Sequence, residues 1–406
     1  MRYPLLSAIG HSLRTSFFSS SKGRTPPRRE RRRLAFESLE TREMMAVVGL
    51  QDFNVSATTG EKPQAKAWEY AGQMWSVMSS SNGTWVRRLD GTSWTPVHQI
   101  TSASGFHADV KTVGDLAHVL LYKGASSQFA TLQFDAGPDN RYEAWQLQPQ
   151  LTPVPVGGGS ETSTLEVDST RRMWVTYDPG SSIKVRYSDG LFTNWSEPIT
   201  VASGIKSDDI STIMAMPNNS IAVMWSNQNT RRFGFRTHVD GTLPTQWTAD
   251  ELPASQSALK VGKGMADDHI NVTVASDGTV YAAVKTSYDT SGRPKIALLV
   301  RRPNGTWDDL YTVATQGTRP IVLVNEAARR LIVAHTTVDG GGNIVYRESS
   351  MDNIAFGPRK TLLSGSLNDV TSTTQTFTDQ VVVMAAGGGR VRSALFSFDT
   401  INMNQA

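Results

Sequence analysis

The sequence predicts an all-β fold, a seven-bladed β-propeller of four-stranded antiparallel blades. Three observations favour this fold: an aromatic residue recurs about every 50 residues, an apolar β-branched run lies upstream of it, and an Asx-Gly or Gly-Pro turn separates the two in most copies. Four-stranded units repeated at such a period are typical of a propeller. The aromatic residues are Trp94, Trp145, Trp195, Trp247, Trp307 and Phe356, with separations of 51, 50, 52, 60 and 49 residues.

The first element, residues 1–45, differs in composition from the rest of the chain. It holds 10 Lys/Arg against 4 Asp/Glu, with a basic block at 28–33, and no apolar run long enough to span a bilayer. The string from Leu34 to Met45 resembles the amino-terminal extension of exported planctomycete-type proteins. That resemblance implies a targeting segment on a secreted or cell-surface protein, followed by a propeller over 46–406. The alternative is a basic arm for nucleic acid or anionic lipid.

Seven apolar runs then mark the blades in chain order. The last copy supplies only three strands, so we expect an N-terminal strand within Val47–Val55 to close the last blade and to cover both exposed edges. The five tryptophans of the repeat are interpreted as packing between blades. The runs are Met74–Met78, Leu116–Leu121, Met173–Tyr177, Ile221–Trp225, Val280–Val284, Leu331–His335 and Val381–Met384.

The turn at Ser188–Trp195 resembles a degenerate Asp-box (BNR-type) repeat of sialidase-like propellers, with altered spacing. In that superfamily the boxes are structural turns, so the resemblance implies the fold and no activity. A sialidase also needs an arginine cluster, whereas only Arg319 lies at a comparable position here. Sialidase activity itself is therefore not expected.

The start of each innermost strand and the end of the second strand should meet at one axial mouth, and these positions are rich in polar residues. Solvent at a wet channel would explain part of this polarity. As catalytic candidates we take Asp268, His269, Asp209, Glu161 and Tyr177, and as substrate-binding candidates His107, Asp109, Tyr122, Trp225, Asn227, Lys285, Arg319 and Gln64.

Carboxylates, imidazoles and amides beside aromatic rings suit a sugar, so the predicted partner is an extracellular polysaccharide. Three functions stay open: hydrolysis by two carboxylates, β-elimination on a uronic acid by a cation, a base and an acid, or binding alone as a lectin or interaction scaffold. No cofactor is predicted, although Asp267, Asp268, His269 and Asp209 are ligand types for a divalent cation. With no cysteine, disulfides and thiolate sites are excluded. A monomer without nucleic acid or a transmembrane segment is predicted.

Overall fold

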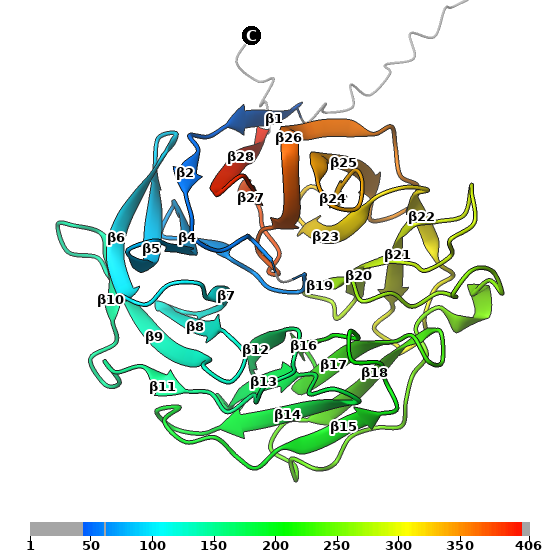
Figure 1. Cartoon of the computed structure of the whole chain (residues 1–406), viewed down its shortest axis with the longest axis horizontal. Helices are drawn as coiled ribbons and strands as arrows, with labels where there is room; N and C mark the ends of the chain where they lie inside the picture. Colours follow the sequence, from blue (N-terminus) through cyan, green and yellow to red (C-terminus); the bar gives the residue numbers. More distant parts are fainter. Residues whose placement is uncertain (1–43, 61, 400–406) are drawn as a thin grey trace, which may run out of the picture. The chain divides into compact units, whose positions relative to one another are not determined.

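The computed structural model describes residues 44–60 and 62–399, which belong to a compact unit spanning Arg42–Ala406. Most of the predicted targeting segment lies outside the described residues. Within the unit, strand follows strand, and the only helix among the described residues is the 3₁₀ turn η1 (Ser255–Ser257). Antiparallel sheets stand around a common centre, as Figure 1 shows. The prediction of an all-β propeller is confirmed.

The first three sheets follow each other along the chain, and each is an antiparallel meander. In the second sheet an additional short strand, β11, pairs with β9. The strands are β3 (Ala67–Tyr70), β4 (Gln73–Ser80), β5 (Gly83–Asp90) and β6 (Ser93–Thr101); β7 (His107–Val113), β8 (Leu116–Tyr122), β9 (Gln128–Asp135), β10 (Arg141–Ala144) and β11 (Thr152–Pro153); and β12 (Ser163–Val167), β13 (Met173–Tyr177), β14 (Ser182–Ser188) and β15 (Ile199–Ser203).

The next two sheets differ in their outer edge. The fourth has three strands, and its edge is completed only by an isolated bridge between Phe235 and Glu251. The fifth has the full four. The strands are β16 (Ser211–Met216), β17 (Ser220–Asn227) and β18 (Arg232–Val239), then β19 (Ile270–Val274), β20 (Val280–Lys285), β21 (Ile296–Arg301) and β22 (Tyr311–Ala314).

The remaining eight strands form one sheet because the long strand β26 takes part in two blades. Its first part pairs with β25 and its last residues pair with β27. When the sheet is divided within β26, the strands group into seven blades. The strands are β23 (Thr318–Asn325), β24 (Arg330–Thr336), β25 (Gly342–Ser350), β26 (Lys360–Thr371), β27 (Gln380–Gly387), β28 (Arg390–Asp399), β1 (Met44–Gly49) and β2 (Phe53–Asn54).

An N-terminal strand closes the last blade, as the sequence predicts. β1 pairs antiparallel with β28 along its whole length, and β2 pairs with the start of β28. Met44 and Met45, placed with the targeting segment by the sequence analysis, are the first residues of β1. The two ends of the described chain are thereby joined in one sheet, as Figure 1 shows.

The core lies between blades rather than inside them. Strands such as β13 are buried along their whole length because both faces of each sheet pack against a neighbouring blade. Among the described residues, the buried apolar side chains form seven clusters, each shared by adjacent blades. One cluster joins Met74 and Trp94 of the first blade to Val382 and Met384 of the last, which closes the ring.

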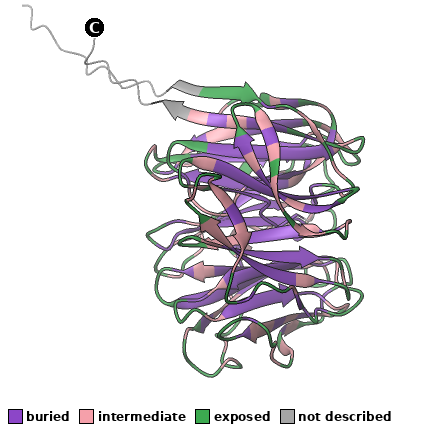
Figure 2. Cartoon of the chain, turned by 90° about the vertical axis from the view of Figure 1, so that its left-hand side faces the viewer, coloured by how far each residue is buried: buried purple, intermediate pink, exposed green. Residues whose placement is uncertain are grey.

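Four of the five repeat tryptophans pack in these clusters: Trp94, Trp195, Trp247 and Trp307. The fifth, Trp145, is half-buried and lies outside the described clusters. Most buried residues lie in strands, whereas the connecting loops and outer strands such as β1 carry most of the exposed ones (Figure 2). In the described part of the chain, no helix has the length and apolar character needed to cross a membrane.

Candidate functional site

The innermost strands of neighbouring blades are aligned start to start. Near the beginning of β12, Thr164 Oγ1 accepts a hydrogen bond from the backbone of Ile213 in β16, at 3.2 Å. The side chain of Asn271 in β19 accepts one in the same way from Val322 of β23, at 3.0 Å. The starts of the innermost strands therefore meet at one end of the ring, which we call the mouth.

Lys62, which precedes the first blade, crosses the mouth. Its ammonium donates to Glu161 of the third blade at 2.5 Å and to Asp268 of the fifth, and the Lys62 side chain is only 6% exposed. Burial acts most strongly on the pKa of Lys62 and would lower it, but the charges of Asp268 and Glu161 outweigh burial and raise that pKa. Lys62 thus stays charged and ties three blades together at the centre of the mouth.

His269 lies beside this lysine in a hydrogen-bonded acidic cluster. Its Nδ1 is 2.7 Å from both Asp267 and Asp268, and its Nε2 is 3.3 Å from the hydroxyl of Thr318. Ionised carboxylates only accept, so Nδ1 carries the hydrogen. Burial alone would raise the pKa of Asp268, but the hydrogen bond and charge of His269, followed by Asp267 and Lys62, hold it far below its ordinary value.

Lys285 extends the network toward the sixth blade. Its ammonium is 3.7 Å from Asp267 and 3.2 Å from Asp339. Burial would raise the pKa of Asp339, but the charge and hydrogen bond of Lys285 outweigh it and lower that pKa. Acids and cations therefore alternate from Glu161 through Lys62 and the His269 cluster to Asp339.

His107 and Tyr122 form a second polar group at the mouth, as register partners on β7 and β8. His107 Nδ1 is 2.5 Å from the carbonyl oxygen of Gly60, and that oxygen only accepts, so Nδ1 carries the hydrogen. Burial, together with the charge of Lys66, lowers the pKa of His107. His107 is therefore neutral at pH 7, with an unprotonated Nε2. The hydroxyl of Tyr122 donates to the backbone of Ser160, at 2.5 Å.

Three of the predicted residues use their side chains to form hydrogen bonds with backbone groups of the blades. Asp109 accepts from the backbone of Ala65 at 2.7 Å and of Leu165 at 2.8 Å, and burial raises its pKa to about 6. Gln64 donates to the carbonyl oxygen of Ser163 at 2.9 Å. Asp209 is fully buried, and it accepts backbone hydrogen bonds from its own loop and from the residue after β17.

Two of the three predicted aromatic residues, Tyr177 and Trp225, pack in cores between blades. Tyr177 packs in the core between the second and third blades, where its hydroxyl accepts from Arg186 at 3.1 Å. Burial, the largest effect, raises the pKa of Tyr177. Trp225 is 2% exposed and, with Asn227, lines a separate cavity of about 350 Å³ beside β17 and β18. Arg319 lies at the start of β23, where it pairs with Asp369 of β26.

Several charged residues near the mouth were not among the site candidates taken from the sequence. Lys62 stands in a polar stretch that the repeat places at a strand start, but nothing in that stretch indicates a reach across the axis. Asp178, at the end of β13, accepts from the backbone of Glu161 at 2.8 Å. Burial, with the nearby Glu161 charge, raises the pKa of Asp178 to about 7. Asp369 lies in the long strand β26 and carries no sequence signal.

The cation site considered from the sequence is partly assembled. Ligand atoms of Asp267, Asp268 and His269 lie within 4.8 Å of one another, and such oxygen and nitrogen donors suit a divalent ion. The fourth candidate, Asp209, is held by its own loop. Ammonium groups of Lys62 and Lys285 already neutralise these carboxylates. The donor set therefore does not need an added ion.

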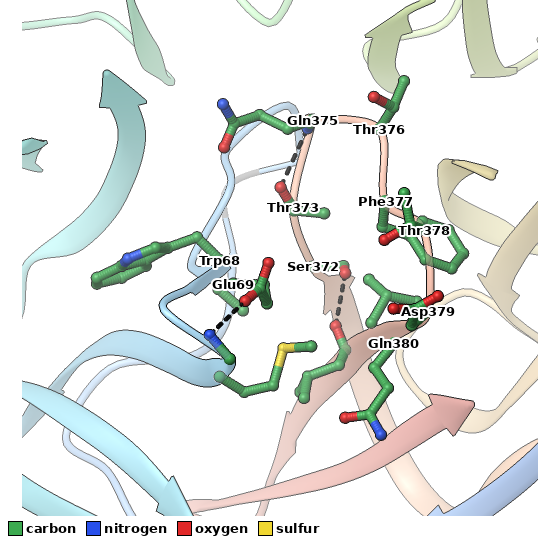
Figure 3. Close-up of a pocket in the computed structure, with 15 residues that line it drawn as sticks. Trp68, Glu69, Ser372, Thr373, Gln375, Thr376, Phe377, Thr378, Asp379 and Gln380 are labelled. Carbon is green, nitrogen blue, oxygen red and sulfur yellow. Dashed lines mark hydrogen bonds between the residues drawn. The ribbon is translucent and has the colours of Figure 1, made fainter. Parts of the chain in front are cut away.

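A separate cavity of about 350 Å³ lies at the other end of the ring, between the first and last blades. Figure 3 shows the side chains that line it, which come from β3 and from the segment 372–380 and include Trp68, Glu69, Phe377 and Asp379. No predicted site residue lines it. The mouth is therefore the place where the predicted polar residues gather.

Comparison with known proteins supports an exported propeller. Residues 30–49 match the family model described as "Planctomycete extracellular", which suggests an extracellular or exported protein. No curated protein sequence matches the chain.

Similar solved structures include two polysaccharide lyases and a eukaryotic propeller. An ulvan lyase of family PL25 is 10% identical over 84% of this chain and 95% of its own, with a TM-score of 0.54. The polysaccharide lyase Uly1 is 10% identical over 88% of this chain and 100% of its own, with a TM-score of 0.50. The WD40 domain of Toxoplasma gondii coronin is 7% identical over 89% and 88%, with a TM-score of 0.58. At these identities the likeness establishes the propeller fold alone.

Proposed function

We propose that this exported propeller binds an extracellular glycan across the mouth. The observation that carries the proposal is the hydrogen-bonded network that links Glu161, Lys62, Asp268 and His269 from three blades. Glu161 and Asp268 keep 29% and 21% of their side chains exposed, so part of the network is accessible to hydroxyl groups. One similar propeller, an ulvan lyase, is described as bound to a GlcA–Rha3S repeat, which gives a precedent for a glycan on this fold.

The network argues against hydrolysis by the central acid pair. Oxygens of Glu161 and Asp268 contact the same ammonium, so they lie within about 5 Å of each other, near the separation of a retaining glycosidase. The space between them is filled by Lys62. A glycosidic bond could enter there only after that buried, doubly paired lysine had left.

Elimination on a uronic acid is the second candidate, and His107 favours it. A base must remove the proton next to the carboxylate, the bond to the leaving oxygen then breaks as a carbon–carbon double bond forms, and the leaving oxygen takes up a proton. The neutral His107 has an unprotonated Nε2, and no described residue bonds to that nitrogen. Tyr122, the register partner of His107, is the candidate acid; it donates to Ser160 and would have to exchange that bond for the leaving oxygen.

A polysaccharide panel scored for binding and for unsaturated products tests both candidates. We expect Asp268→Asn and His269→Ala each to weaken binding at least tenfold, since both remove a member of the network. Asp352→Asn, an exposed carboxylate paired with Arg329, is the control and should bind normally. Wild-type binding by both mouth variants, with unchanged thermal unfolding, would remove the mouth as the binding site.

The product assay uses histidines matched for environment. His107→Gln should abolish unsaturated product while glycan binding persists. His98 on β6 is also partly buried, and burial lowers its pKa, so His98→Gln serves as the control. If wild-type protein binds a glycan but releases no product, the protein is a binder and elimination is refuted.

A further inference from the structure

Two residues at the mouth have backbone conformations that side chains other than glycine disfavour. Arg319 has a φ of 50° and Asp369 a φ of 53°, both in the left-handed region. Each lies where the register of its strand slips, between Thr318 and Ile321 in β23 and between Asn368 and Thr371 in β26. Bulges of this kind redirect side chains. Here the two redirected side chains meet as an ion pair between the sixth and seventh blades.

Stability does not explain why arginine and aspartate stand at these positions. Glycine or asparagine would adopt the same φ with less strain. A partly exposed ion pair contributes little in return, and the Arg319 and Asp369 side chains are 26% and 15% exposed. Strained non-glycine residues tend to persist at functional sites.

The guanidinium of Arg319 is only partly engaged. Asp369 approaches its Nε, and that contact lacks the geometry of a hydrogen bond. Among the described residues, no hydrogen bond reaches Nη1 or Nη2, although three-quarters of the side chain is buried. The planar edge of a guanidinium, when its N–H donors are free, binds carboxylates and sulfates through two parallel hydrogen bonds.

The surroundings of Arg319 are polar. Gly60 lies against Asp369, since a Cβ at Gly60 would be 3.4 Å from the Asp369 carboxyl carbon. His107 bonds to the carbonyl of Gly60 and feels the charge of Asp369. Arg319, Asp369 and the free Nε2 of His107 therefore belong to one corner of the mouth.

We infer that Arg319 is the receptor for an acidic substituent of the glycan, a carboxylate or a sulfate ester. Asp369 orients the guanidinium through Nε, and the free edge takes the anion. The inference rests on the proposed glycan binding and adds that the glycan is anionic.

Binding to two matched polymer pairs tests it: polygalacturonate against its methyl ester, and dextran sulfate against dextran. We expect wild-type protein to prefer the charged member of at least one pair by tenfold or more. Arg319→Gly removes the guanidinium and relaxes the backbone, so that preference should disappear while the thermal midpoint stays the same or rises. Arg319→Lys keeps the charge without the planar edge and should lose most of the preference.

Arg171→Gly is the matched control. Arg171 also has a positive φ, 68°, but lies in the turn between β12 and β13, so its replacement relaxes the same strain and removes the same charge away from the mouth. It should keep the preference.

The outcomes separate the inference from the proposed function. Equal binding of charged and uncharged partners, or a preference that survives Arg319→Gly, overturns the inference and leaves glycan binding standing. Binding to no member of the polymer panel overturns both.

Discussion

Replacing Lys62 by methionine removes the ammonium that Glu161 and Asp268 share while keeping a side chain of similar length. Two carboxylates that contact one nitrogen would then face each other without it. At about 5 Å and an effective dielectric constant near 20, their repulsion is roughly 3 kcal/mol. Removing one partner of a buried ion pair costs a similar 3–5 kcal/mol or so. We expect Lys62→Met to lower the free energy of unfolding by about 3 kcal/mol at pH 7.

The loss of unfolding free energy caused by Lys62→Met should become smaller as the pH falls. In the wild type the pKa of Asp268 is depressed, so its stabilising contribution is present above the unfolded pKa and is lost as pH falls through the folded value. In the variant, repulsion raises the pKa of one carboxylate, and a proton taken up as the pH falls relieves the repulsion. The difference between variant and wild type should therefore shrink from pH 7 to pH 5. The raised pKa of Lys62 keeps the wild-type contribution in place until strongly alkaline pH.

Urea unfolding, followed by tryptophan fluorescence at pH 7 and at pH 5, measures the difference in unfolding free energy between the variant and the wild type. Adding Glu161→Gln to Lys62→Met should recover most of the loss, because only one charge then remains. Lys111→Met is the matched control: Lys111 has a single carboxylate partner, Glu166 at 2.8 Å, so no like-charged pair is left behind. A loss below about 1 kcal/mol, or one that the second substitution leaves unchanged, would refute the interpretation of Lys62 as the central charge of the mouth.

Two further predictions concern the cores between blades. A Cβ on Gly234 would lie 2.2 Å from the ring of Trp225, so Gly234→Ala should lower the free energy of unfolding in urea by about 3 kcal/mol. Gly158→Ala is the control: its Cβ would have open space around it, so this substitution should be neutral. Burial lowers the pKa of His118 to about 4, so the free energy of unfolding should fall by about 3 kcal/mol as the pH drops from about 6.5 to 4. His118→Phe should remove this pH dependence. An unchanged pH dependence in the variant would contradict His118 as its source.

The fold was predictable because it depends on local repetition. Aromatic residues about 50 residues apart and apolar runs between turns specify similar blades, whatever the details of each. The closing N-terminal strand was also predictable, since a last copy with only three strands leaves an edge that needs a partner. β1 and β2 supply that partner. The three-stranded fourth sheet and the doubly paired β26 could not be foreseen, because both depend on loop lengths and register slips.

The site was predictable only in its location. The spacing of the sequence repeats places residues at the mouth, but it does not determine which way each side chain points. Asp109 and Asp209 stand at the expected positions, yet they turn to backbone N–H groups that would otherwise lack a partner. Lys62 contacts residues 99 and 206 positions away, and no periodicity encodes such a contact. The left-handed Arg319 arises from a bulge, which a single sequence does not mark.

The segment that matches the extracellular family model overlaps in sequence with the strand that closes the propeller. The family match ends at residue 49, and β1 spans Met44–Gly49, so the last residues of the export-type segment are also the strand that covers β28. A processing step beyond Met44 would shorten this pairing and expose the edge of the last blade, and one beyond Gly49 would remove it entirely. An exposed strand edge invites pairing with other chains. The full pairing of β1 with β28 is therefore kept only if any removal of the segment leaves Met44 and the residues after it in place.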